Sequence, residues 1–286
     1  MKKSEILENL FWVLPTISEY HSPNTFLYNL LKKIARREVE DLFQEKKGNN
    51  IGFNPFGELN FPYYNMGAVD SLNLFDLDEL IMLSFYWQNR TRYNKVLDIG
   101  ANLGLHSIIL SKCGYSVSCY EPDPFHFKIL KENLALNNAS NVKCYNMAVS
   151  NENGKMEFVR VLGNTTGSHL IGSKPNPYGE LEKISVETRS FKSILNVFDF
   201  VKMDVEGHEN ALVCSTDKDD WKNKEGILSI HDKTNALALY KHFKDLGIKL
   251  FSQKINWHLV SRLEDMPLNH YEGSLFVTTE DKMFWE

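Results

Sequence analysis

The sequence predicts an α/β fold with a doubly wound, mostly parallel sheet of seven strands, an antiparallel edge and an N-terminal helical cap. From residue 92 onward, short apolar runs alternate with segments whose apolar residues recur at helical spacing. Alternation of this kind is typical of a parallel sheet with helices on both faces. The last apolar runs are too close together for helical crossovers, and they therefore predict the antiparallel edge.

Residues 1–91 are expected to form the cap, because most of this part has a helical pattern. An amphipathic helix is expected near the N-terminus. Ser22 as a cap and Pro23 in the first turn predict the start of a second, long helix. Asp76 and Glu79 have the spacing of a capping box ahead of a third helix. No linker rich in Gly, Ser or Pro follows, so we expect the cap to pack on the rest of the chain.

Residues 92–286 are expected to form the main domain. The segments "KMEFVRVL" and "KISVETRSF" interrupt its alternation and predict two strands joined by a long polar loop. Two more strands are expected within "FDFVKMDV" and "GILSIHD". The remaining strands are expected at 95–99, 116–121, 142–147, 248–252, 256–261 and 274–279, and the helices at 104–112, 124–136, about 208–214 and about 234–246.

The segment "VLDIGANLGLHSI" predicts a strand, a tight turn and a helix, a unit that aims free backbone N–H groups at a ligand. The run from Gly100 lacks the second glycine of the dinucleotide fingerprint, which disfavours a nicotinamide-dependent oxidoreductase. Asp98, before the turn, suits a ligand with an ammonium group. Glu121, at the end of the second strand, suits the two hydroxyls of a ribose. Together they indicate S-adenosylmethionine as the cofactor.

Five motifs follow one another along the chain: "VLDIGANLGLHS", "CYEPDP", "NVKCYNMAVSNENG", "GNTTGSHL" and "FVKMDVEGHE". Their order resembles the FkbM family of S-adenosylmethionine-dependent methyltransferases, and the similarity covers roughly residues 92–235. The resemblance implies a Rossmann-like class I methyltransferase fold. It also implies that the cofactor is bound by Asp98, Gly100, Asn102, Gly104, Glu121, Pro122, Met147, Ala148 and Asp204.

Candidate catalytic residues follow the fourth and fifth parallel strands, because ligands bind at the carboxyl ends of the strands in this fold. They are His231, Asp232, Glu206 and His208. His231 is the first choice for a general base, since a histidine beside a carboxylate can titrate near neutrality. A histidine satisfied at a strand end is the alternative interpretation. Asp204, His231 and Asp232 also suit Mg²⁺ or Mn²⁺, although no metal is the favoured expectation.

The net charge of the chain and the absence of one motif restrict the chemical class of the methyl acceptor. A net charge of −5 does not suit nucleic acid. The Asn-Pro-Pro-Tyr-type loop of enzymes that methylate base amines does not follow the fourth strand, and "NPYG" at 176–179 is expected to be a turn. We therefore expect a hydroxyl of a sugar or similar polyol, in a small molecule or a glycan. An N- or carboxyl-methyltransferase and a non-catalytic cofactor-binding module are the alternatives.

Two further segments are expected near the site. The aromatic segment 51–67 predicts two short strands around a bend, and its Phe61, Tyr63 and Tyr64 either line a sugar pocket or pack the cap on the sheet. The polar segment 163–170 is expected to be a mobile loop over the active site. The sequence has no apolar run of membrane-spanning length, so no membrane span is expected. The four cysteines show no metal-ligand spacing and are expected to be reduced thiols, which favours a cytoplasmic location. The oligomeric state stays open.

Overall fold

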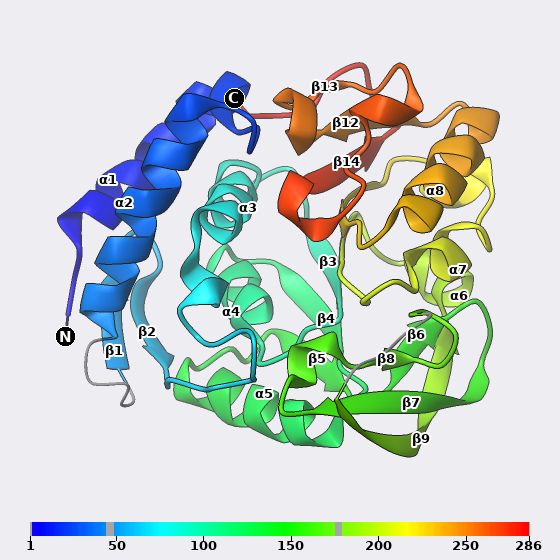
Figure 1. Ribbon diagram of the computed structural model, residues 1–286, viewed down its shortest axis with the longest axis horizontal. Coiled ribbons are helices and arrows are strands. Elements are labelled where there is room, and N and C mark those ends of the chain that lie inside the picture. The colour runs from blue at the N-terminus through cyan, green and yellow to red at the C-terminus, as the bar shows by residue number, and fades with distance from the viewer. Residues whose placement is uncertain (1, 44–48, 175–178, 286) are drawn as a thin grey trace.

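The computed structural model describes residues 2–43, 49–174 and 179–285. Its centre is an eight-stranded sheet in which the five strands that follow residue 92 in alternation run parallel and the last three pair antiparallel (Figure 1). The strand order is β13 (His258–Leu259), β12 (Lys249–Ser252), β14 (Ser274–Thr278), β11 (Glu225–Ser229), β10 (Phe200–Met203), β3 (Lys95–Ile99), β4 (Ser116–Tyr120) and β5 (Val142–Tyr145).

The mostly parallel α/β sheet and its antiparallel edge are confirmed, but the expected count of seven strands is wrong. Each segment expected to be a strand of this sheet forms one, and together they make eight strands. The strand expected at 256–261 is shorter than predicted: it is β13, a two-residue segment that pairs with β12 at the edge of the sheet.

Helices cover both faces of the sheet. Successive side chains of a strand point to opposite faces, and here both faces carry apolar side chains that need to be covered. Val96 belongs to one hydrophobic cluster and Leu97 to another. The first cluster includes side chains of α3 (Leu77–Gln88), α4 (Leu105–Lys112) and α5 (Pro124–Leu136). The second includes side chains of α6 (Phe191–Leu195), α7 (Glu209–Val213) and α8 (Lys233–Leu246). The sheet is therefore doubly wound.

A separate four-stranded sheet carries the two strands that interrupt the alternation (lower right in Figure 1). Its order is β6 (Ala148–Ser150), β9 (Glu180–Ser190), β7 (Gly154–Leu162) and β8 (His169–Leu170). The expected pair is confirmed as β7 and β9, which run antiparallel. Short 3-10 segments complete the main domain at Thr165–Gly167, Lys218–Trp221, Gln253–Ile255, Leu263–Asp265 and His270–Glu272.

Before residue 92 the chain forms helices and one hairpin, as the pattern predicts. The elements are α1 (Glu5–Val13), η1 (Leu14–Tyr20), α2 (Phe26–Leu42), β1 (Asn49–Phe53), β2 (Gly57–Phe61), η2 (Asn73–Phe75) and α3. The strands β1 and β2 pair antiparallel around the expected bend. Phe61 is buried against the rings of Tyr64 and Phe75, so it packs the core and does not line a pocket.

One expected helix start and one expected capping box are wrong. The helix α2 begins at Phe26, and its cap is Thr25, whose hydroxyl accepts the Tyr28 N–H. Ser22 instead donates through its hydroxyl to the carbonyl of Lys254, 2.6 Å away. Asp76 lies at the cap position of α3 without a capping hydrogen bond, and Glu79 contacts His106 instead of closing a capping box.

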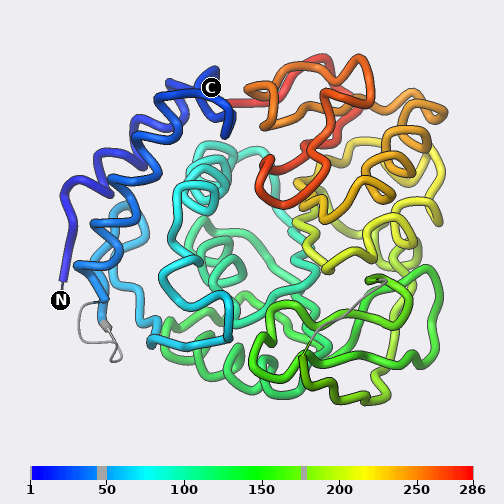
Figure 2. The backbone as a smooth tube through the Cα atoms, viewed as in Figure 1, coloured from blue at the N-terminus to red at the C-terminus, as the bar shows by residue number. Residues whose placement is uncertain are grey.

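Residues from both ends of the chain share the first hydrophobic cluster. Leu7 and Phe11 of α1 lie in it together with Val96 and Trp285. The C-terminal end lies beside the N-terminal helices (Figure 2), where Trp285 meets the ring of His21 at a centroid distance of 4.9 Å. No helix in the described ranges is both long and apolar enough to cross a lipid bilayer.

Deletion of residues 1–91 is expected to give a fragment that aggregates. The deletion removes one side of the shared cluster and exposes apolar surface on α4 and α5. Size-exclusion chromatography of the fragment beside the full chain measures this. A monomeric 92–286 fragment that still binds S-adenosylhomocysteine would contradict the expectation and show that the proposed boundary at residue 92 separates two independent units.

Candidate functional site

The turn between β3 and α4 has the shape of a ligand cradle. Gly100, Asn102 and Gly104 all have positive φ values, of 76°, 51° and 90°. A Cβ atom on Gly100 would lie 1.8 Å from the carbonyl oxygen of Asp204, so the backbones of the cradle and of the β10 end touch. Glycine is therefore required at position 100 by both conformation and space. The expected strand–turn–helix unit is confirmed.

Asp98, at the end of β3, is held by groups of this chain. Its side chain is fully buried, accepts a hydrogen bond from Ser107 Oγ at 2.6 Å and lies 3.4 Å from Lys202 Nζ. Lys202 also donates to the carbonyl of Gly100, 3.1 Å away. Asp98 therefore supports the turn through Lys202, and its contact with a ligand's ammonium group stays a prediction.

Glu121 joins the cradle to the start of α5. Its carboxylate accepts the backbone N–H of Asn102 and that of Asp123, both at 2.8 Å. Burial raises the pKa of Glu121 to about 8, against the effect of these two N–H groups. The carboxylate retains acceptor positions for further donors, as a ribose with two hydroxyls would supply.

The residues expected around an adenine follow β4 and β5. Asn146 donates through its side chain to the carbonyls of Glu121 and Pro122, at 2.9 and 3.1 Å, which ties the two strand ends together. Met147 is half-buried against the second hydrophobic cluster, and Ala148 is buried in β6. Asn146 thus links Glu121 to the start of β6, and contact of Met147 and Ala148 with an adenine stays a prediction.

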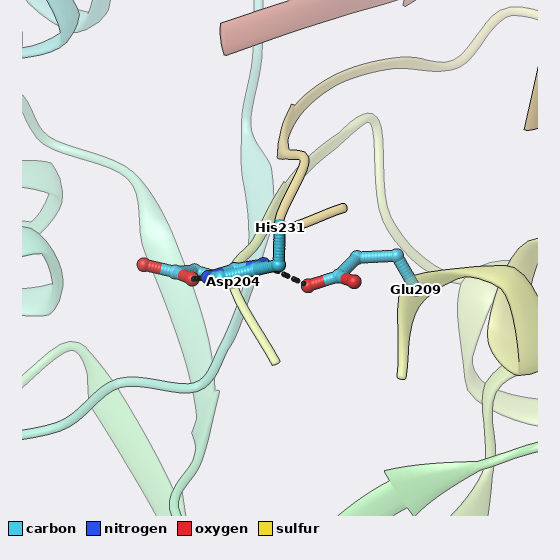
Figure 3. A group of neighbouring side chains, drawn as sticks. All are labelled: Asp204, Glu209 and His231. Atoms are coloured by element: carbon cyan, nitrogen blue, oxygen red, sulfur yellow. Dashed lines mark ion pairs between the residues drawn. The ribbon is translucent and has the colours of Figure 1, made fainter. Parts of the chain in front are cut away.

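A group of charged side chains lies at the carboxyl ends of β10 and β11 (Figure 3). The Nε2 atom of His231 lies 3.3 Å from Asp204 Oδ1 and 3.7 Å from Glu206 Oε2. Its other ring nitrogen, Nδ1, lies 2.9 Å from Glu209 Oε1. The imidazole therefore lies between carboxylates on both of its edges. The Asp204 backbone also touches the cradle at Gly100, so the cluster adjoins the cradle.

The carboxylates around His231 change its titration. Burial alone would lower the pKa of His231, but Glu209, Asp204 and Glu206 outweigh burial and raise it well above its usual value. Burial alone would likewise raise the pKa of Asp204, but His231 and Lys202 outweigh it and lower that pKa. The expectation of a histidine that titrates near neutrality is therefore wrong for this arrangement.

Glu206 is part of the cluster, and its loop is held in an unusual backbone conformation. Glu206 has a φ of 55° and contacts the Lys174 ammonium, while burial raises the pKa of its carboxyl. The next residue, Gly207, has a φ of 99°, and a Cβ there would lie 2.8 Å from the Ser173 carbonyl oxygen. The loop therefore presents Glu206 toward His231 in a fixed geometry.

Two of the expected catalytic residues are used elsewhere. Asp232 caps α8, where its carboxylate accepts the Asn235 N–H at 2.8 Å and the Asn235 side-chain amide at 2.7 Å. His208 is buried between the hydroxyls of Ser150 and Ser173, at 2.9 and 3.0 Å, and burial lowers its pKa. Both expectations are corrected: the Asp232 carboxylate caps a helix, and the His208 ring is hydrogen-bonded to two hydroxyls.

Sequence reasoning missed two residues of this site, Lys202 and Glu209. Lys202 is a lysine within an otherwise apolar strand, and such a charge needs a partner when buried. That signal was present in the sequence. Glu209 ends the "DVEGHE" run, where the pattern predicts only a helix. Its fully buried carboxylate nevertheless accepts the N–H groups of Val205 and Gly207 at 3.1 and 3.4 Å.

The segment 163–170 is docked on α5 and on the chain before β3. The hydroxyl of Thr165 lies 2.8 Å from His126 Nε2, and its N–H donates to the Met66 carbonyl, also at 2.8 Å. Together with Tyr64 and α5, this segment encloses a pocket of about 520 Å³. The expectation of a mobile loop over the catalytic residues is not supported by these contacts. The turn expected at 176–179 lies, except for Gly179, outside the described residues.

Residues 98–238 match the family model described as the methyltransferase FkbM domain. The chain carries an FkbM methyltransferase domain. The matched range begins at Asp98, includes the cradle, Glu121 and the charged cluster, and ends within α8. The resemblance drawn from the five motifs is therefore confirmed at the level of the family.

Known proteins similar to this chain include methyltransferases. The chain is 26% identical over 163 residues to methyltransferase sdnD of Sordaria araneosa, a match that covers 44% of this chain and 62% of that protein. The chain thus spans less than two thirds of this relative. Solved structures that match include an FkbM methyltransferase from Methylobacillus flagellatus KT (17% identity, TM-score 0.41, 72% of this chain and 52% of that chain). Another is a precorrin-6y C5,15-methyltransferase from Geobacter metallireducens GS-15, with 12% identity and a TM-score of 0.37. That match covers 67% of this chain and 82% of the other.

Proposed function

We propose that this chain is an S-adenosylmethionine-dependent O-methyltransferase that acts on a hydroxyl of a sugar or similar polyol. One observation carries the proposal: the charged cluster of Asp204, Glu206 and His231 directly adjoins the glycine cradle, since Gly100 touches the Asp204 backbone. Groups that can hold a hydroxyl and receive its proton thus lie beside the expected end of the methyl donor. The acceptor class rests on the acidic net charge and the missing Asn-Pro-Pro-Tyr loop.

The residues of the cradle fit the cofactor. Asn102 Oδ1 is buried without a hydrogen-bond partner among the described residues, and Glu121 keeps acceptor positions beside it. A cofactor with an ammonium group and two ribose hydroxyls supplies donors of the kind these acceptors require. When bound, S-adenosylmethionine supplies a methyl group on a positively charged sulfur.

Most of the rate enhancement would come from holding the acceptor hydroxyl in line with the methyl group. Well-oriented reactants avoid about 7–11 kcal/mol of entropic and solvent cost. The partly exposed carboxylates of Asp204 and Glu206 would hold the acceptor by accepting hydrogen bonds from its hydroxyls. One of the groups at the cluster would take the proton of the reacting hydroxyl, a step that adds roughly 10²–10⁴-fold to the rate. Asp204, whose pKa is lowered, is ionised and ready to accept such a bond.

The proposal is tested by incubating the full chain with labelled S-adenosylmethionine and a panel of unmethylated glycans, sugar alcohols, small amines and carboxylic acids. We expect S-adenosylhomocysteine to form with hydroxyl acceptors, and the methyl ether to be found by mass spectrometry. Transfer to amines or carboxylates alone would replace the O-methyltransferase proposal with the alternative. Cofactor binding without transfer to any class would favour a non-catalytic module.

Glu121→Gln is expected to weaken S-adenosylhomocysteine binding roughly 10- to 100-fold, because a hydrogen bond to a charged acceptor contributes about 1.5–3 kcal/mol. Binding to the parent should also release protons near pH 7. The free carboxyl has a pKa of about 8 and must ionise to accept both ribose hydroxyls, so affinity should rise with pH until about 8. Calorimetry in buffers of different ionisation enthalpy measures both effects.

Glu187, exposed on β9, offers the matched control for this prediction. Glu187→Gln removes the same charge and should leave both the affinity and the proton release unchanged. If Glu121→Gln bound the cofactor as tightly as the parent, Glu121 would not be the ribose ligand.

A further inference from the structure

The charged cluster of Asp204, Glu206 and His231 has no group that is well suited to take a proton. Burial would lower the pKa of His231, but the carboxylates at its two ring nitrogens raise it, so this imidazole is protonated at neutral pH. Despite burial, the pKa of Asp204 is lowered by His231, and a group with a low pKa is a weak base. Glu206 is already paired with the Lys174 ammonium. The proton of a reacting hydroxyl therefore needs another acceptor.

A second imidazole, that of His270, lies beside the cluster. Its ring centroid is 6.3 Å from that of His231, and the two ring planes are inclined at 32°. His270 begins the 3-10 segment His270–Glu272, which leads directly into β14. Ser274, the first residue of β14, pairs with Ser229, the last residue of β11. The segment before β14 and the residues after β11 therefore lie at the same end of the sheet.

The backbone on both sides of His270 is held in place. Asn269 caps the segment, because its side chain accepts a backbone N–H at 2.9 Å. The Glu272 carboxylate accepts the backbone N–H of Leu268 at 2.8 Å and lies 3.0 Å from Lys254 Nζ. These contacts fix the segment against its surroundings, so the fold itself sets the position of the imidazole beside the cluster.

The ring of His270 is accessible and has room to accept a proton. The residue is exposed, and neither ring nitrogen has a hydrogen-bond partner among the described residues. The histidines of the cradle helix and of the loop after β10 differ from it in this respect. His106 and His208 each use both ring nitrogens in hydrogen bonds. Of these three histidines, His270 is therefore the one whose ring can receive a proton from an acceptor and release it to solvent.

The charges that face His270 favour its neutral form. Burial lowers its pKa, and the cations of His231, after β11, and Lys174, after β8, lower it further, while Asp204, after β10, has the opposite effect. The Glu272 carboxylate of its own segment is paired with a lysine. A pKa below the usual value of 6.5 leaves the imidazole unprotonated at neutral pH, which is the state that a general base requires.

We propose that His270 is the general base that takes the proton of the reacting hydroxyl. The inference deepens the proposed function and rests on it. The acceptor oxygen forms its bond to the methyl carbon with its own electron pair, the carbon–sulfur bond breaks toward sulfur, and the hydroxyl proton passes to a ring nitrogen of His270. Since one proton cannot be given to an imidazole and a carboxylate at once, Asp204 and Glu206 hold a neighbouring hydroxyl. An acceptor with two adjacent hydroxyls, as in a sugar or polyol, suits this arrangement.

The first test replaces the imidazole and then supplies it from solution. The assay uses saturating cofactor and the hydroxyl acceptor of the panel that the parent methylates fastest. His270→Ala should lower kcat roughly 10²- to 10⁴-fold. Added imidazole should restore part of the rate, because the exposed position admits a small base. His258→Ala, an exposed histidine outside the cluster, is the matched control and should keep full activity without imidazole.

The second test follows the ionisation of the histidines. The kcat of the parent should fall as the pH drops through the lowered pKa of His270 and stay constant above it, and His270→Ala should lose this dependence. Nuclear magnetic resonance of the full chain with labelled histidine, without cofactor or acceptor, measures the same ionisation directly. The signal that His270→Ala removes should be that of a neutral ring at pH 7, whereas the signal that His231→Ala removes should be that of a protonated ring.

Three outcomes would contradict the assignment while leaving the proposed function standing. They are an unchanged kcat in His270→Ala, a protonated His270 at pH 7 in the parent, and a pH dependence that is lost in Glu206→Gln but kept in His270→Ala. The last would make Glu206 the base. If the parent transfers no methyl group to any hydroxyl acceptor, the proposed function fails, and the assignment of His270 fails with it.

Discussion

His231→Ala is expected to lower kcat by about 10²-fold or more and to leave the affinity for S-adenosylhomocysteine unchanged. The side chain lies at the centre of the charged cluster, within 3.7 Å of three carboxylates. It touches none of the atoms of Glu121 or Asn102 that are proposed to bind the cofactor. The loss should therefore fall on the reaction and not on cofactor binding. Steady-state kinetics and calorimetry on the same preparation separate the two.

The substitution also leaves Glu209 buried without its imidazole, so the stability of the variant must be measured alongside its activity. His231→Asn keeps a polar group beside Glu209 and should show the same loss of kcat in a more stable protein. His258→Ala, at the exposed β13 edge, is the matched histidine control and should keep full activity. Unchanged turnover in both His231 variants would mean that positioning by other residues drives the reaction.

The fold and the cradle could be predicted because their signals are local. The turn from Gly100 to Gly104 is enclosed by a buried strand and an apolar helix, and all three features are visible within thirteen residues. Glu121 could be placed because it ends the next strand, and parallel strands carry their ligands at that end. A residue can be placed from the sequence when its position depends only on the residue pattern of a single strand, turn or helix.

The composition of the catalytic cluster could not be predicted in the same way, because it depends on contacts between elements. Asp232 follows His231 directly, but its backbone begins α8 and its carboxylate becomes the cap. Glu209 reaches the imidazole only because the loop at Glu206 and Gly207 turns through positive φ values. Asp98 is paired with a lysine on the neighbouring strand, and no pattern within one strand shows that pairing.

Gly100→Ala is expected to be the most damaging single-methyl change in the site. Alanine at a φ of 76° carries a conformational penalty of about 1–2 kcal/mol. Its Cβ would also lie 1.8 Å from the Asp204 carbonyl oxygen and 2.9 Å from the Asp204 carbonyl carbon, so either the cradle or the β10 end must move. We expect the free energy of unfolding to fall by roughly 4 kcal/mol or more, and cofactor binding to be lost.

Gly114→Ala isolates the part of this effect that comes from the clash. Gly114 follows α4, has a φ of 94° and has no atom within 4 Å of the position of a Cβ, so alanine there meets the conformational penalty alone. Urea unfolding of the two variants gives the clash energy as their difference, and S-adenosylhomocysteine titration should show binding only for Gly114→Ala. Equal stability of the two variants, with the cofactor bound by both, would mean that the Gly100 turn does not press on Asp204. The cradle and the charged cluster would then be separate sites, and the argument that places the reacting hydroxyl beside the methyl donor would lose its structural basis.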